Sequence, residues 1–114
     1  MSFNERRLNQ VRMVGLGPTL LYEPPRQSIV LATYMTIAHN GVGAALLDIY
    51  HVENNEAVGV NTVIHDAVPY LPGFFYDLTS KIILNTIENT SSGLYLVTDT
   101  ADVLNITLYG ATIK

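Results

Sequence analysis

One stretch of the chain, residues 28–39, alternates along its whole length and carries no charged residue before its final histidine. Its side chains form two sets on opposite sides of an extended backbone, and both sets are mostly uncharged. One set is Ile29, Leu31, Thr33, Met35 and Ile37, and the other is Val30, Ala32, Tyr34, Thr36 and Ala38. Strands without charge on either face are typically central in a sheet. We therefore predict a central strand here, with Ile29, Leu31, Met35 and Ile37 in the core.

Shorter runs of the same kind predict six further strands, separated by Gly, Asn, Asp and Pro residues. They cover residues 19–22, 44–52, 58–64, 81–87, 94–98 and 103–113. Asn40-Gly41 is typical of a hairpin turn, so strand 28–39 is expected to pair with 44–52. By the same reasoning, 94–98 should form a hairpin with 103–113. In that last strand Leu104, Ile106 and Leu108 are expected to point inward.

No long stretch of the chain shows a convincing helical period. Short strands at a spacing of about 8–12 residues, joined by turn residues, are the pattern of an antiparallel sandwich or barrel. The sequence thus predicts an all-β fold, a jelly-roll-like antiparallel β-sandwich of about seven or eight strands.

The first thirteen residues differ from the rest, because they lack strand alternation and hold Arg6, Arg7 and Arg12, half of the basic residues. We expect an extended N-terminal arm over 1–17 and a β-sandwich domain over 18–114. The arm can be explained in two ways, as a contact to an acidic neighbouring subunit or as a solvated, fraying terminus. On the first explanation it is needed for assembly and dispensable for folding.

Composition narrows the functional classes. The chain has 114 residues, 48% hydrophobic and only 14% charged, with a net charge of −4 and no cysteine. This balance excludes a wholly disordered chain, and the lack of cysteine excludes disulfides and thiolate metal sites. No apolar run is long enough for a membrane span or a secretory signal, and the acidic balance argues against nucleic-acid binding. So few charges favour a protein that contacts others of its kind, although exposed Thr and Tyr on strands would give the same composition.

Candidate catalytic and metal-binding residues do not form a recognisable motif. His39, His51 and His65 lie on three separate segments without metal-ligand spacing. Asp99 and Asp102 flank one turn, which supplies too few oxygens for a calcium site. No serine lies in a nucleophile elbow. We expect no metal, no cofactor and no enzymatic activity.

Seven tyrosines and a proline-rich aromatic segment remain, at residues 70–76. We expect this segment, within a loop over 65–77, to cap the core through Phe74 or Phe75 and to offer Tyr70 or Tyr76 as contacts. Together with the arginines this gives a set of expected assembly contacts: Arg6, Arg7, Arg12, Tyr34, Tyr50, Tyr70, Tyr76 and Tyr109. Tyrosines such as Tyr22, Tyr34, Tyr50 and Tyr109 could alternatively stack on sugar rings.

Read end to end, residues 18–113 resemble small virion structural proteins of tailed bacteriophages. The segments that carry the resemblance are PTLLY at 18–22, SIVLATYMTI at 28–37, HNG at 39–41 and GLYLVTDTADVLNITLYG at 93–110. The resemblance implies a β-sandwich module built into a capsid, neck or tail, without catalytic residues.

The function expected from this resemblance is that of a capsid decoration (cement) protein, which binds the assembled shell in many copies. The alternatives are a neck or tail component, or a carbohydrate- or receptor-binding module. The expected partners are major capsid or neck/tail subunits and further copies of the chain, with a trimer favoured. The expected location is the virion, and the host cytoplasm during assembly.

Overall fold

The computed structural model describes residues 5–54, 56–59, 61–72 and 75–113, apart from the side chains of 66–68, 75–78 and 80. It contains eight strands and, within these residues, no helix long and apolar enough to cross a membrane. The strands are β1 (Arg6–Arg12), β2 (Thr19–Tyr22), β3 (Ile29–His39), β4 (Ala45–Glu53), β5 (Val63–Tyr70), β6 (Phe75–Asn85), β7 (Ser92–Thr98) and β8 (Leu104–Thr112).

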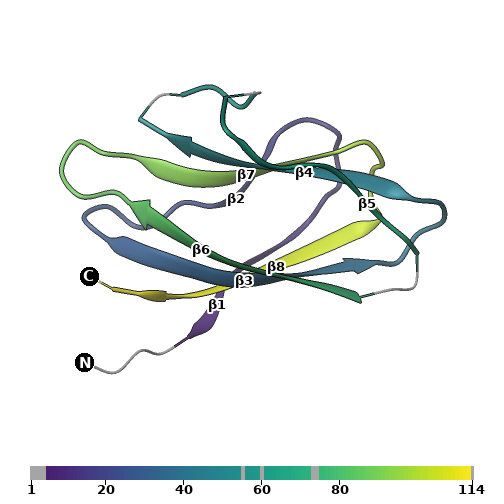
Figure 1. Cartoon of the computed structure of the whole chain (residues 1–114), viewed down its shortest axis with the longest axis horizontal. Helices are drawn as coiled ribbons and strands as arrows, with labels where there is room; N and C mark the ends of the chain where they lie inside the picture. The colour runs from purple at the N-terminus through teal and green to yellow at the C-terminus, as the bar shows by residue number, and fades with distance from the viewer. Residues whose placement is uncertain (1–4, 55, 60, 73–74, 114) are drawn as a thin grey trace.

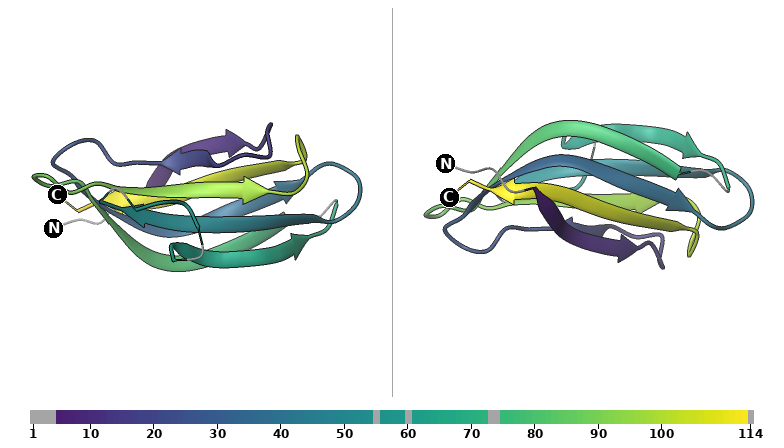
Figure 2. Two further views of the ribbon diagram at one scale, coloured as in Figure 1. Left: turned by 90° about the horizontal axis from the view of Figure 1, so that it is seen from above. Right: turned by 90° about the horizontal axis from the view of Figure 1, so that it is seen from below.

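The strands form two four-stranded antiparallel sheets packed face to face (Figure 1). The order is β1-β8-β3-β6 in one sheet, here called the β1 sheet, and β2-β7-β4-β5 in the other, the β2 sheet. Every connection except β4–β5 passes from one sheet to the other, and Figure 2 shows each sheet from its own side. Two interleaved sheets of this order make an eight-stranded jelly roll. The predicted fold class is therefore confirmed.

The core lies between the sheets and is almost entirely aliphatic. Side chains with no exposed surface come from both sheets, among them Ile37 and Ile106 from one and Leu47 and Leu96 from the other. In β8 the predicted inward residues Leu104, Ile106 and Leu108 are all buried. Alternation along one strand thus predicted correctly which face of β8 is buried.

A β-bulge changes the faces of β3. The pairing of β3 with both neighbours shifts between Ala32 and Tyr34, so that one extra residue interrupts the alternation. Met35 and Ile37 are buried as predicted, whereas Ile29 and Leu31 are half-buried and Val30 and Ala32 take their place inside. The prediction of Ile29 and Leu31 as core residues was wrong, because a bulge exchanges the two faces of a strand beyond it.

The N-terminal segment is part of the sandwich. Residues 6–12 form β1, which pairs with β8 along its length, and Leu8 and Val11 pack against the core. Met13 has no exposed surface, and its carbonyl accepts a hydrogen bond of 2.7 Å from the Asp102 amide. The expectation of an arm without strand structure was wrong for these residues, because a long-range partner strand outweighed the weak local alternation.

Both predicted hairpins were also wrong. β3 lies in the β1 sheet and β4 in the β2 sheet, and β7 and β8 are divided in the same way. A two-residue Asn-Gly hairpin turn requires a positive φ at both residues, but in this loop only Gly43 (φ 77°) has one. The chain therefore crosses between sheets here.

The middle of the chain differs from the prediction as well. The strand expected over 58–64 begins only at Val63, and the expected loop over 65–77 holds most of β5 and the start of β6. Pro69 lies within β5, which is an edge strand, where the missing backbone N–H costs no ladder hydrogen bond. The side chains of Phe74, Phe75 and Tyr76 lie outside the described residues.

Candidate functional site

The most reaction-like cluster joins β4 and β7. The Nε2 atom of His51 lies 3.0 Å from Ser92 Oγ and 3.1 Å from Glu53 Oε1. A serine nucleophile with a histidine base needs the acid on the opposite ring nitrogen, so that the ring can pass a proton between them. Here both contacts meet the same nitrogen, and Ser92 is buried. The cluster therefore lacks the geometry of a catalytic relay and ties the two strands together.

The other two histidines serve local structure. His39 is buried, and its Nδ1 accepts a hydrogen bond of 3.1 Å from the Gly41 amide. His65 Nε2 lies 2.8 Å from the hydroxyl oxygen of Tyr70. Burial lowers the pKa of His65, and the nearby Asp48 carboxylate offsets part of that effect. Within the described residues, no group of three or more His, Asp or Glu side chains could hold a metal ion.

The three arginines that were expected to be contact residues make different interactions in the structure. Arg12 Nε forms an ion pair of 2.7 Å with Asp102 Oδ1, while its other nitrogens donate to the Asp102 carbonyl (2.6 Å) and to Asn40 Oδ1 (3.2 Å). Arg12 therefore holds the end of β1 to two loops. Arg6 donates to Thr112 Oγ1 at 3.1 Å and Arg7 to Gln10 Oε1 at 3.3 Å, both on the exposed surface.

The expected tyrosine contacts lie in different places. Tyr70 is only 2% exposed and belongs to the core, so its prediction as a contact was wrong. Tyr50 lies on the outer face of the β2 sheet, where its hydroxyl donates to Asp48 Oδ2 at 3.2 Å. The side chain of Tyr76 lies outside the described residues.

Tyr34 and Tyr109 form a cross-strand pair on the outer face of the β1 sheet. Their ring centroids are 4.4 Å apart and their planes differ by 7°, so the rings are stacked. Each ring covers one face of the other, which is a stabilising arrangement within the sheet.

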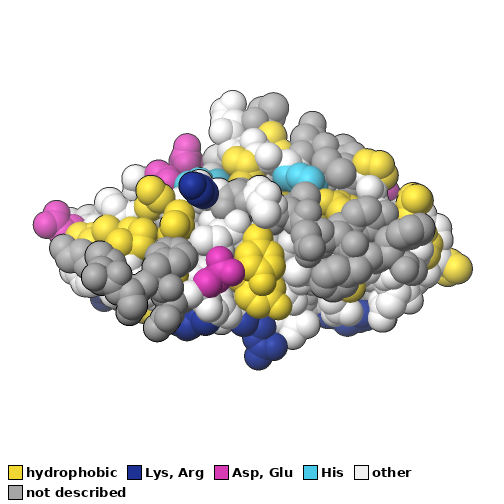
Figure 3. Space-filling model, turned by 60° about the horizontal axis from the view of Figure 1, so that its bottom comes forward, with side chains coloured by type: hydrophobic (Ala, Val, Ile, Leu, Met, Phe, Trp, Pro, Cys, Tyr) yellow, Lys and Arg dark blue, Asp and Glu magenta, His cyan; other side chains and the backbone are white. Residues whose placement is uncertain are grey.

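The outer face of the β1 sheet is polar but carries little charge at its centre. Register sets Arg7 beside Tyr109 and Tyr34, and the next row holds Gln10, Thr107 and Thr36. Figure 3 views this side of the molecule, where much of the described surface is white or yellow and most of the dark blue cations lie along the lower rim. One acidic side chain is placed here too, because Glu5 accepts a hydrogen bond from Thr33.

The outer face of the β2 sheet is more apolar. Strand pairing places Leu20, Tyr95, Tyr50 and Val63 in one row across all four strands. Large apolar side chains with exposed surface on the same sheet are Leu20 (42%), Leu46 (38%) and Ile64 (50%). The sequence analysis did not identify this row, because it is assembled from four segments whose register depends on tertiary pairing.

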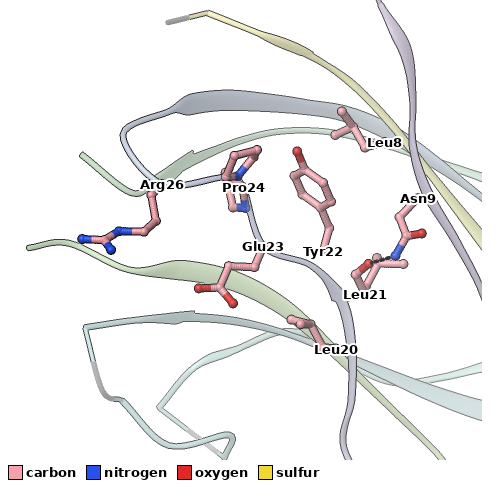
Figure 4. Close-up of a pocket in the computed structure, with 9 residues that line it drawn as sticks. Leu8, Asn9, Leu20, Leu21, Tyr22, Glu23, Pro24 and Arg26 are labelled. Atoms are coloured by element: carbon pink, nitrogen blue, oxygen red, sulfur yellow. Dashed lines mark hydrogen bonds between the residues drawn. The ribbon is translucent and has the colours of Figure 1, made fainter. Parts of the chain in front are cut away.

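A groove of about 550 Å³ runs along the open edge of the sandwich, between β1 and β2 (Figure 4). Leu8, Asn9 and residues 20–26 line it, and the ring of Tyr22 lies between Pro24 and Leu8. Asn9 Nδ2 donates to the Leu21 carbonyl at 2.6 Å and so links the two edge strands. Burial raises the pKa of Tyr22, an effect that Arg6 partly offsets.

Comparison with known proteins gives little further assignment. No protein-family model and no curated protein matches the chain. Among solved structures it is similar to a chain in the structure of the infectious bursal disease virus Gt strain, with 13% sequence identity and a TM-score of 0.48. The match covers 98% of this chain and 30% of that one, so this chain spans less than a third of the other's length. A likeness of this degree assigns no function, and no sequence match supports a relation to tailed bacteriophages.

Proposed function

We propose that this chain is a non-enzymatic structural protein of a virus particle, and that it acts as a capsid decoration protein. The observation that carries the proposal is a compact jelly roll with two broad outer faces crossed by uncharged rows, Gln10, Thr107 and Thr36 on the β1 sheet and Leu20, Tyr95 and Tyr50 on the β2 sheet. Jelly rolls of eight strands are common among viral capsid domains, although the same fold also serves lectins and enzymes. Such faces suit contacts with other proteins better than contacts with solvent.

The polar clusters support a binding role over a catalytic one. Each described histidine and Arg12 is engaged in a structural contact: His51 and Arg12 link different strands or loops, and His39 and His65 bond nearby residues of their own segment. A decoration protein needs only such a rigid block, because it stabilises a shell by binding the assembled lattice in preference to loose subunits. A neck or tail component would use the same surfaces. The two faces of this chain lie on opposite sides of the molecule, and this arrangement would suit a neck or tail component that repeats copy after copy.

The test is to purify particles by density gradient from the culture that produces the protein and to quantify the chain in them by mass spectrometry. We expect many copies per particle, in a fixed ratio to the major shell protein, and earlier heat disruption of particles that lack the chain. Particles without the chain would refute the proposal. Specific binding of the purified protein to a glycan array, without particle association, would instead support a recognition module.

A further inference from the structure

The two sheets differ in charge. The strands of the β1 sheet contain four of the six basic residues, Arg6, Arg7, Arg12 and Lys81, against one acidic residue. The strands of the β2 sheet contain three acidic residues and no basic one. Arg12 is paired with Asp102, so three cations of this sheet remain, against Asp77 in β6 and Glu5 beside β1, and the sheet keeps an excess of one positive charge. The sheets are therefore electrostatically complementary to one another.

The acidic sheet also has apolar surface to cover. Leu20 (42%), Leu46 (38%) and Ile64 (50%) are exposed on its strands, and the row Leu20, Tyr95, Tyr50 and Val63 crosses its outer face. Asp48 lies on the same face, next to the Tyr50 hydroxyl. Exposed apolar side chains that gather on one face of a small domain are typical of an interaction site.

Size and placement suit a contact between copies. The molecule measures 43 × 31 × 19 Å, and the two sheets lie one above the other in the view down the shortest axis (Figure 1). Each outer face is then bounded by the 43 and 19 Å extents, an area of roughly 800 Å², close to the ~800 Å² per partner of a standard interface.

We propose that the outer face of the β2 sheet docks on the outer face of the β1 sheet of a second copy of this chain. Asp48 on one copy then meets the outer face of the next between Arg7, on the edge strand β1, and Lys81, on the opposite edge strand β6, around an apolar and tyrosine-rich centre. This inference deepens the proposed function by naming the partner of these surfaces, and it rests on that function only for its biological setting.

A contact between two different faces is heterologous, so it leaves one unused face at each end of the assembly. Because the two faces lie on opposite sides of the sandwich, successive copies add in nearly one direction. The contact therefore builds an open stack or a large ring, in place of the trimer expected from the sequence.

The test uses two double variants. One reverses the charge of the β1 face, and the other adds positive charge to the β2 face. Arg7→Glu with Lys81→Glu alters the β1 face, and Leu46→Lys with Ile64→Lys alters the β2 face. All four side chains are at least partly exposed, so we expect melting temperatures close to that of the unaltered protein. Val42→Lys is the matched control, because Val42 is 89% exposed in the loop between β3 and β4 and lies on neither face.

Sedimentation velocity over a range of protein concentrations is the measurement. The unaltered protein and the Val42→Lys control should grow in mass with concentration, less so at high salt. Each double variant alone should self-associate on the order of tenfold more weakly, because like charges now meet. An equimolar mixture should associate more strongly than either variant alone, since each variant keeps the face that the other has lost.

Two results would overturn the inference. One is an unaltered protein that stays monomeric at every concentration. The other is self-association of either double variant as strong as that of the unaltered protein, which would mean that like faces pair. Should a double variant melt early, Leu20→Lys alone provides a second alteration of the β2 face with the same expected result. Particles that lack the chain would refute the proposed function and leave this contact standing, so the two failures are distinguishable.

Discussion

Replacing Ile37 by alanine should destabilise the protein far more than the same change at Leu31, two positions that local alternation places on one face. The Ile37 side chain has no exposed surface and lies in the core, whereas Leu31 lies beyond the β-bulge and is only half-buried. Losing three buried carbons costs roughly 2–3 kcal/mol in transfer free energy, at about 0.8 kcal/mol each. The cavity left between two sheets raises the expected loss for Ile37→Ala to about 3–5 kcal/mol.

Leu31→Ala should cost about 1 kcal/mol, because its side chain is partly exposed on the outer side of the sheet and no enclosed cavity results. Urea unfolding followed by far-ultraviolet circular dichroism or tyrosine fluorescence measures both values, since the chain has seven tyrosines and no tryptophan. The difference corresponds to a gap of roughly 10 °C or more in melting temperature. Equal losses for the two variants, at equal m-values, would show that the bulge and the resulting choice of faces are wrong.

Three further outcomes are expected. Gly110→Ala should cost about 2–3 kcal/mol in thermal or urea unfolding, because a Cβ there would overlap the Leu31 carbonyl oxygen. Gly93→Ala is the control and should cost much less, since the nearest atom to its Cβ would be 3.5 Å away. Equal losses for the two variants would contradict this prediction. Stability should fall as pH drops below about 6.5, because burial lowers the pKa of His65 and the unfolded chain therefore takes up the proton first. The melting temperature of His65→Gln should depend less on pH. A pH dependence equal to that of the unaltered protein would refute this assignment. Deleting residues 1–12 should abolish cooperative unfolding by calorimetry, since β8 loses one of its two partner strands and the core loses Leu8 and Val11. A truncated protein that melts like the full chain would instead show that this segment is dispensable for folding.

Much of the fold could be predicted from local pattern. The alternation of β8 gave its inward residues, and the extent of β3 was nearly right, because side chains in a strand alternate with a period of two whatever the strand pairs with. Low charge and the absence of a catalytic motif likewise led to the expectation of a binding protein. Of the candidate site, Tyr34, Tyr50 and Tyr109 were expected to be contact residues, and they lie on the outer faces of the two sheets.

The rest depended on partners that are distant in the sequence. A hairpin at Asn40-Gly41 would require β4 to lie beside β3. Because β8 pairs with β3 instead, the chain crosses to the other sheet after this turn. The strand character of residues 6–12 and the burial of Tyr70 have the same origin, since β1 pairs with β8 and Tyr70 closes one end of the core.

The sequence by itself determined that the chain is all-β, where most of its strands lie and how few charges it has to place. Only the tertiary structure decided the order of the strands within the jelly roll, that a bulge exchanges the faces of β3, and that basic residues collect on one sheet and acidic residues on the other. The physical reason is that alternation and turn preference act over neighbouring residues, whereas strand order and register are set by long-range hydrogen bonds and by burial of the two inner faces against each other.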